Sequence, residues 1–333
     1  MRELFNESSD YYNIERKPQG NIKIPAVFAY DIVAASKKRL QSTKCKSASL
    51  RNKGKQGNMT KRVLTMQDIS CLGQCSLTVA LPVISACGIE TAVLPSSVLS
   101  NHTAFKSWTF NDLTFDMENI LSQWKKENVT FSAFYTGYVS EAQIPIIKKI
   151  IKETSRKDAL VVVDPVMADN GKMYPGFSAD FPQKMAELCN GADVVIPNIT
   201  EASFLLGIEY RSENYEKEYI EKICSGLIKL GAKNVVLTGV SFEKDKLGVA
   251  IYDGKSIEYY FTEKLPVQMH GTGDVFASSF AGSLCNGKTL LESAKIAANY
   301  VVESIKATID DKDHWYGVKF EKAIPYLVRA LGK

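Results

Sequence analysis

The strongest constraint on the fold of this 333-residue chain is an alternation of two patterns that begins after Met59. Short apolar runs, typical of buried strands, alternate with longer amphipathic stretches, typical of helices. The strand-like runs are 63–67, 91–94, 131–135, 160–163, 194–196, 235–237, 249–252 and 257–261. The helix-like stretches lie near 76–87, 114–126, 141–154, 178–189, 214–230, 273–286 and 290–307.

This alternation predicts an α/β fold. Strands that are separated by helices pair in parallel, and the crossover helices cover both faces of the sheet. The last two strand-like runs are joined by Asp253-Gly254, a pair that favours a tight turn, so we expect a β-hairpin there. We therefore predict a three-layer α/β/α domain with a mostly parallel central sheet, whose ligands bind at the carboxyl ends of the strands.

Charge separates the first part of the chain from the rest. Residues 1–58 contain 12 Lys and Arg against five acidic residues, a net charge of +7, whereas residues 59–333 carry −3. This basic segment also has few large apolar side chains, which is typical of a flexible extension. We therefore expect an extension over 1–58 and one folded domain over 59–333. The mildly acidic body argues against nucleic acid as a partner, while an RNA- or membrane-surface role for the extension stays open.

Hydropathy and cysteine content limit the cellular setting. The chain has no run of 18 apolar residues and does not begin with a signal-peptide pattern, so we expect a cytoplasmic protein without a membrane partner. Its seven cysteines are scattered and odd in number, which favours reduced thiols. Cys71 and Cys75 have no second Cys or His pair nearby, so a zinc site is not expected.

Polar residues follow three of the strand-like runs at the points where those runs end. They are Asp164 and Asp169 after 160–163, Asn198 and Glu201 after 194–196, and Thr238-Gly239 after 235–237. One such residue alone is often a helix cap or a turn former. Two acids at neighbouring strand ends suit Mg²⁺, which prefers a few carboxylates together with water and phosphate oxygens.

Two candidate phosphate-binding motifs lie close together in "HGTGDVFASSFAGSLCNGKT", residues 270–289. The second, "GSLCNGKT", has the P-loop letters but follows a helical stretch, whereas a P-loop must follow a strand. We expect Gly287 to end that helix and Thr289 to begin the next, so this match is coincidental.

The first motif, Gly271-Thr272-Gly273-Asp274, leads from an extended segment into a helix that we expect to begin near Gly273. A glycine turn at a helix N-terminus can present backbone N–H groups to a phosphoryl group. Asp274 in the first helical turn is then placed to accept a proton from an attacking hydroxyl. The alternative is a carboxylate that only caps the helix.

From about Val63 to its end, the chain resembles the ribokinase-like superfamily and, within it, the vitamin B6 kinases. The motifs that carry the resemblance, in family order, are "LSNHT" (99–103), "TGY" (136–138), "DPVMADNG" (164–171), "PNITEA" (197–202) and "GTGDVFASSFAG" (271–282). The resemblance implies a kinase domain over 59–333 that uses ATP and Mg²⁺ to phosphorylate the 5′-hydroxymethyl group of pyridoxamine, pyridoxal or pyridoxine. It also implies a homodimer and, as in many members, a monovalent cation.

The same resemblance implies a role for each motif residue. Asp274 would be the catalytic base, and Gly271, Thr272 and Gly273 would form the anion hole. The metal would be held by Asp164, Asp169 and Glu201. The nucleotide would contact Asn198, Thr238 and Gly239. The acceptor ring would lie against His102, Thr103 and Tyr138, and residues 169–177 would cover the site as a flap.

One position departs from the family pattern. Pyridoxal kinases usually have a serine at the end of the tripeptide that here reads Met66-Gln67-Asp68. Asp68 can pair with the cationic amine of pyridoxamine, and equally with the N–H donors of an aminopyrimidine. A hydroxymethylpyrimidine kinase of thiamine synthesis therefore stays an alternative, as does a non-catalytic B6-binding protein built on the kinase fold.

Overall fold

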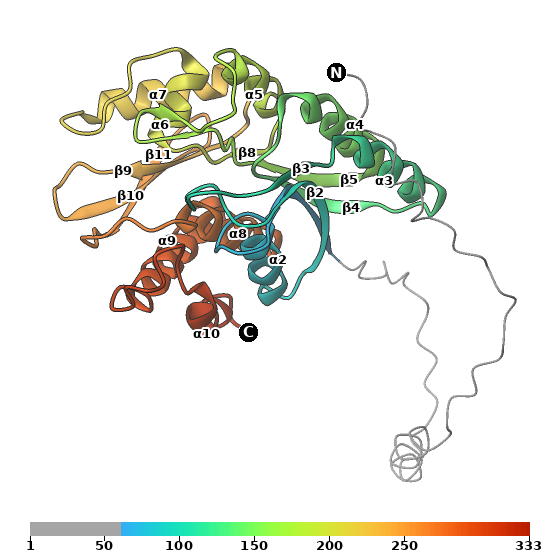
Figure 1. The fold of residues 1–333 in the computed structure, drawn as a ribbon. Coiled ribbons are helices and arrows are strands. Elements are labelled where there is room, and N and C mark those ends of the chain that lie inside the picture. The colour runs from blue at the N-terminus through green and yellow to red at the C-terminus, as the bar shows by residue number, and fades with distance from the viewer. Residues whose placement is uncertain (1–60) are drawn as a thin grey trace, which may run out of the picture. The chain divides into compact units, whose positions relative to one another are not determined.

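The computed structural model describes residues 61–333, and the extension predicted over 1–58 lies outside the described residues (Figure 1). Within the described part, one mixed sheet has the strand order β11-β10-β9-β8-β5-β4-β1-β2-β3. The strands are β1 (Arg62–Ser70), β2 (Glu90–Leu99), β3 (Phe110–Asp112), β4 (Phe131–Thr136), β5 (Ser155–Val163), β8 (Val194–Val195), β9 (Val235–Val240), β10 (Lys246–Tyr252) and β11 (Ile257–Glu263).

The central sheet is mostly parallel, as predicted. All pairs from β9 across to β2 are parallel, while β10, β11 and β3 run antiparallel to their neighbours. The hairpin expected around Asp253-Gly254 is confirmed as β10 and β11. A separate two-stranded hairpin, β6 (Ala168–Asp169) and β7 (Lys172–Met173), lies beyond the end of β5.

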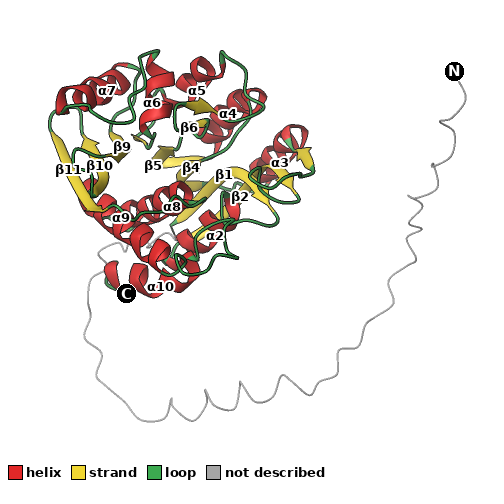
Figure 2. Cartoon of the chain, turned by 60° about the vertical axis from the view of Figure 1, so that its left-hand side comes forward, coloured by secondary structure: helices red, strands yellow, loops and turns green. Residues whose placement is uncertain are grey.

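Helices cover both faces of the sheet, which confirms the three-layer α/β/α prediction (Figures 1 and 2). One face carries α2 (Leu77–Ala86), α8 (Thr272–Cys285), α9 (Leu290–Lys306) and α10 (Phe320–Ala330). The other carries α3 (Thr114–Lys126), α4 (Ile144–Thr154), α5 (Phe181–Cys189), α6 (Ile199–Leu206) and α7 (Lys217–Lys229). In α7 the buried residues Ile220, Ile223, Cys224 and Leu227 recur at helical spacing, so one stripe faces the sheet. Within residues 61–333, no helix has both the length and the apolar character needed to span a membrane.

Four elements were not predicted. Strands β3, β6 and β7 have two or three residues each, too few to leave a periodic signal. Helix α10 contains Pro325, a residue that disfavours a helix interior, yet its apolar residues keep the helical period, and Phe320 and Leu327 bury one face of it. The helix expected over 141–154 starts instead with a 3₁₀ turn, η1 (Glu141–Gln143), before α4.

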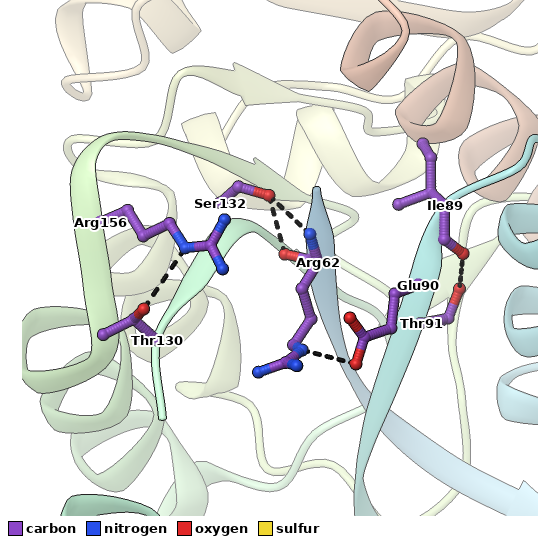
Figure 3. Close-up of polar contacts among 7 residues, drawn as sticks. All are labelled: Arg62, Ile89, Glu90, Thr91, Thr130, Ser132 and Arg156. Carbon is purple, nitrogen blue, oxygen red and sulfur yellow. Dashed lines mark hydrogen bonds and ion pairs between the residues drawn. The ribbon is translucent and has the colours of Figure 1, made fainter. Parts of the chain in front are cut away.

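The amino ends of the central strands are joined by side chains (Figure 3). Ser132 Oγ accepts a hydrogen bond from the Arg62 amide and donates one to the Arg62 carbonyl, each at 2.9 Å, which ties β4 to β1. Arg62 Nε lies 2.7 Å from Glu90 Oε1, which ties β1 to β2. Side chains at this edge of the sheet therefore hold neighbouring strands in register. The polar residues predicted to be functional lie at the opposite edge, at the carboxyl ends of the strands.

Candidate active site

The candidate site lies where the strand order reverses. From β1 the chain proceeds to β2 on one side, whereas β4, β5, β8 and β9 follow one another on the other side. Ligands of open α/β sheets bind in the crevice that this reversal leaves at the carboxyl ends. Asp68 lies near the end of β1, Tyr138 follows β4, and Asp164 follows β5.

The glycine turn and Asp274 stand at the start of α8, as expected. Gly271 has a left-handed backbone with φ 79°, and a Cβ there would collide with the carbonyl oxygen of Gln74. A Cβ at Gly273 would meet no atom within 4 Å, so this position is open to an approaching ligand. Asp274 lies in the first turn of α8. A glycine turn at a helix N-terminus can present backbone N–H groups to a phosphoryl group, and this role of 271–273 stays a prediction.

The P-loop letters have no such setting. Gly282 is buried inside α8, which ends at Cys285. Gly287 has φ 86° directly after the C-cap Asn286, and Thr289 is the N-cap of α9. The interpretation of this match as coincidental is confirmed.

Asp274 has a pKa raised to about 7. Burial is the main cause and the negative charge of Asp68 is the second, while hydrogen bonds from the backbone of Ser76 and of Asp274 itself act in the opposite direction. A general base works best when its pKa lies near the operating pH. The environment of Asp274 therefore suits proton acceptance at neutral pH.

Asn198 and Glu201 brace each other and the hairpin β6–β7. Together they form a capping box at the start of α6, in which each side chain accepts a 2.9 Å hydrogen bond from the other's amide. Glu201 Oε1 also accepts from the Met167 amide at 3.2 Å, and Asn198 Nδ2 donates to the Ala168 carbonyl at 2.9 Å. The helix-cap role weighed for such residues is thus present, and their metal and nucleotide roles stay predictions.

Three carboxylates at this edge are buried and have no cationic partner among the described residues. Asp68, Asp164 and Glu201 are 5%, 7% and 4% exposed, and no Lys or Arg of residues 61–333 forms an ion pair with them or with Asp274. Burial is the main cause that raises the pKa of each of the three, to about 8 for Glu201. Buried charges are normally paired or bound to a cation. Among the described residues, nothing therefore balances the negative charge of these carboxylates, and a bound cation or cationic ligand can do so.

The donor set fits a cation that keeps part of its water. No group of three His, Cys, Asp or Glu side chains in the described part of the chain is arranged to hold a metal ion by itself. Asp169 is exposed at the tip of the β6–β7 hairpin, where its carboxylate accepts hydrogen bonds from Asn170. Mg²⁺ accepts such an open arrangement because it takes one or two carboxylates and completes its shell with water and phosphate oxygens.

Thr238 and Gly239 lie near the end of β9, beside Asn198. The Thr238 amide and hydroxyl both donate to the Pro197 carbonyl, at 2.9 and 3.3 Å. Gly239 is exposed with φ 79°, and a Cβ there would meet nothing within 4 Å. A cavity of about 370 Å³ adjoins this position, and Tyr215 and Ser241 line it. The nucleotide contacts expected of Thr238 and Gly239 stay predictions.

The three predicted acceptor-site residues differ in exposure. His102 is buried, and its Nδ1 accepts a hydrogen bond from the Ala104 amide at 3.1 Å, so Nε2 carries the proton that it donates to the Tyr316 carbonyl at 2.8 Å. Burial lowers the pKa of His102, while its hydrogen bond to the Tyr316 carbonyl acts in the opposite direction. Thr103 is exposed, and Tyr138 is half-buried with its ring 5.4 Å from that of Phe177. Both nitrogens of His102 are engaged within the protein, and its ring centroid lies 4.9 Å from that of Phe105, so its role beside the acceptor ring stays a prediction.

Sequence reasoning missed Ser76, and it gave no separate role to Tyr174, which lies in the segment 169–177 predicted to be a flap. Ser76, the N-cap of α2, has φ 50° and ψ −133°, values that a residue with a side chain rarely adopts, and it hydrogen-bonds toward both Asp68 and Asp274. Tyr174, just after β7, has a pKa raised by burial and by the charges of nearby acids, Glu201 first. Neither had a local signal, since a serine before a helix is ordinary and Tyr174 lies in a segment without periodicity.

Residues 90–318 match the sequence profile of the family described as phosphomethylpyrimidine kinase. The chain belongs to the phosphomethylpyrimidine kinase family. It is 28% identical over 246 residues to a pyridoxal kinase of Dictyostelium discoideum, covering 67% of this chain and 78% of that one. It is 30% identical over 209 residues to a pyridoxine kinase of Bacillus subtilis, covering 60% and 74%.

Solved structures of the family have the same fold. A Bacteroides thetaiotaomicron protein, called a phosphomethylpyrimidine kinase and solved with pyridoxal, is 35% identical with a TM-score of 0.76 over 80% of this chain and 96% of its own. The pyridoxal kinase of Lactobacillus plantarum is 31% identical with a TM-score of 0.74, over 81% and 97%. The resemblance to vitamin B6 kinases of the ribokinase-like superfamily is confirmed.

Proposed function

We propose that this protein transfers the γ-phosphoryl group of ATP to the 5′-hydroxymethyl group of a vitamin B6 compound: pyridoxamine, pyridoxal or pyridoxine. The observation that carries the proposal is Asp274, whose pKa is raised to about 7 in the first turn of α8, directly after an open glycine turn. The pyridoxal and pyridoxine kinases among the relatives support the same reaction. Phosphoryl transfer needs chiefly positioning and electrostatic stabilisation, which this edge of the sheet offers.

Each part of the edge has one task in this proposal. Asp274 orients the acceptor hydroxyl and takes its proton, and the backbone N–H groups of 271–273 donate to the oxygens of the transferring group. Thr238 and Gly239 contact the nucleotide, with Asn198 beside them. Asp68, His102, Thr103 and Tyr138 line the acceptor. Mg²⁺, held by Asp164, Asp169 and Glu201 with water, supplies positive charge to the phosphates.

Product formation by the purified full-length chain tests the proposal. ATP and Mg²⁺ are supplied with pyridoxamine, pyridoxal, pyridoxine or hydroxymethylpyrimidine, and the phosphorylated product is measured by mass spectrometry. Turnover of any B6 compound supports the proposal. Turnover of the pyrimidine alone would assign the protein to thiamine synthesis, the alternative favoured by the name of the matching family. No turnover of any acceptor would favour a non-catalytic binding protein.

We also propose that residues 59–333 suffice for activity, that the enzyme is a cytoplasmic homodimer, and that a monovalent cation assists it. The support is the composition of residues 1–58 and the resemblance to the B6 kinases. Turnover by a 59–333 fragment, light scattering of the purified protein, and rates in potassium against tetramethylammonium salts test these three statements.

A further inference from the structure

Asp68 is the most unusual acid of the site, because it serves neither as the base nor as a metal ligand in the proposed reaction. It is 5% exposed, close to the end of β1, where the pairing with β2 shifts register between Gln67 and Ile69. Its Oδ2 accepts a 3.0 Å hydrogen bond from Ser70 Oγ. No Lys or Arg of residues 61–333 pairs with it. The hydrogen bonds that Asp68 receives come from Ser70, Ser76 and its own backbone amide, all of them neutral groups. A buried carboxylate with only neutral partners is incompletely compensated.

The surroundings of Asp68 place it in the acceptor part of the site. Its charge raises the pKa of Asp274, of Tyr138 and of Cys75, so it lies among the start of α8, the segment after β4 and the loop before α2. All of these groups are acidic or neutral, and none brings a positive charge. Asp68 and Asp274 are therefore two neighbouring carboxylates, and in the proposed reaction one acceptor molecule lies beside both.

The chemistry of the candidate acceptors matches this pair. If Asp274 addresses the hydroxymethyl group, as in the proposed reaction, a neighbouring carboxylate can address the substituent on the adjacent ring atom. That substituent is a protonated aminomethyl group in pyridoxamine and an exocyclic amino group in hydroxymethylpyrimidine. In pyridoxine it is a second hydroxymethyl group, and in pyridoxal an aldehyde, which has no proton to donate.

We infer that Asp68 is a specificity-determining residue, which selects acceptors that carry a nitrogen-bound hydrogen donor next to the reacting hydroxymethyl group, and most strongly the cationic amine of pyridoxamine. This inference rests on the proposed function, since it takes Asp274 as the base. A cationic group beside Asp68 supplies the missing counter-charge. Removing one partner of a buried charge pair costs much more binding free energy than removing one partner of an exposed pair. A neutral acceptor leaves Asp68 without that compensation.

The test compares acceptors in wild type and in Asp68→Asn, using the full chain with ATP and Mg²⁺. We expect wild type to prefer pyridoxamine to pyridoxine. In Asp68→Asn, the ratio of kcat/KM for pyridoxamine to that for pyridoxine should fall by about 30-fold or more. Hydroxymethylpyrimidine, whose amine is neutral, should lose less than pyridoxamine. Asp116→Asn, the same change on the exposed first turn of α3, should leave every ratio unchanged.

The results separate this inference from the proposed function. Wild-type turnover of B6 compounds with a ratio that Asp68→Asn leaves within about threefold would overturn the role of Asp68 and keep the kinase. If the variant does not fold, calorimetric affinities of wild type decide, and equal affinities for pyridoxamine and pyridoxine would overturn the inference. Wild type inactive toward every acceptor would overturn both.

Discussion

Replacing Asp274 by asparagine should inactivate the enzyme and stabilise its fold. The substitution keeps the size of the side chain and removes its capacity to accept a proton, so turnover should fall by about 10²–10⁴-fold. In wild type, kcat/KM should decline on the acid side of about pH 7, where Asp274 takes up a proton. From pH 8 to pH 6 the ionised fraction falls about tenfold, and so should kcat/KM.

The stability gain follows from the same pKa. A carboxyl whose pKa is raised from 3.8 to about 7 destabilises the folded state by up to about 4 kcal/mol above pH 7. Asp274 is half-buried, so part of its hydration remains and we expect about 1–2 kcal/mol. The favourable interaction of a carboxylate with the α8 N-terminus offsets only about 0.3–1 kcal/mol. Desolvation and the repulsion from Asp68 therefore prevail.

Thermal unfolding of wild type and Asp274→Asn at pH 8 and pH 5 measures this effect. At pH 8 the variant should unfold about 2–8 °C higher. The gain should shrink at pH 5, because folded Asp274 then keeps its proton and the cost falls as pH drops toward 3.8. A variant that is less stable than wild type at both pH values would show that Asp274 serves as a helix cap, and the electrostatic reasoning would be refuted.

Four further substitutions test the rest of the site. Gly271→Ala should lower the free energy of unfolding by about 1–3 kcal/mol, because the backbone at 271 is left-handed and the added Cβ would collide with Gln74. Gly273→Ala should fold normally, and thermal melts compare the two variants. Loss of turnover in Gly273→Ala without loss of stability would indicate that this position belongs to the anion hole. Glu201→Gln should raise the Mg²⁺ concentration for half-maximal rate by about 10–100-fold, and an unchanged Mg²⁺ titration would exclude it from the metal site. Asn198→Ala removes the α6 cap and the hydrogen bond to the Ala168 carbonyl, so it should lower the free energy of unfolding by about 1–2 kcal/mol. Urea unfolding measures this change, and an unchanged midpoint would contradict the bracing role of Asn198.

Much of the architecture could be predicted because its signals are local. The alternation of apolar runs with amphipathic stretches predicted the parallel sheet and its two helical layers, and Asp253-Gly254 predicted the hairpin. Gly287 indicated the break between α8 and α9, which excluded the P-loop. What escaped were elements too short to show a period, such as β3, and α10, which keeps a helical period but contains Pro325, a residue that argues against a helix.

The sequence alone determined which polar residues stand at strand ends and at the start of α8, because strand periodicity and glycine turns are properties of adjacent residues. Only the tertiary structure decided how those residues act on one another. It placed Asp68 where its charge raises the pKa of Asp274, it joined Asn198 and Glu201 in a cap, and it set Ser76 between two acids. Burial and electrostatic interaction depend on distances in space between residues far apart in the chain, and the packing of α2 against both β1 and α8 creates those distances.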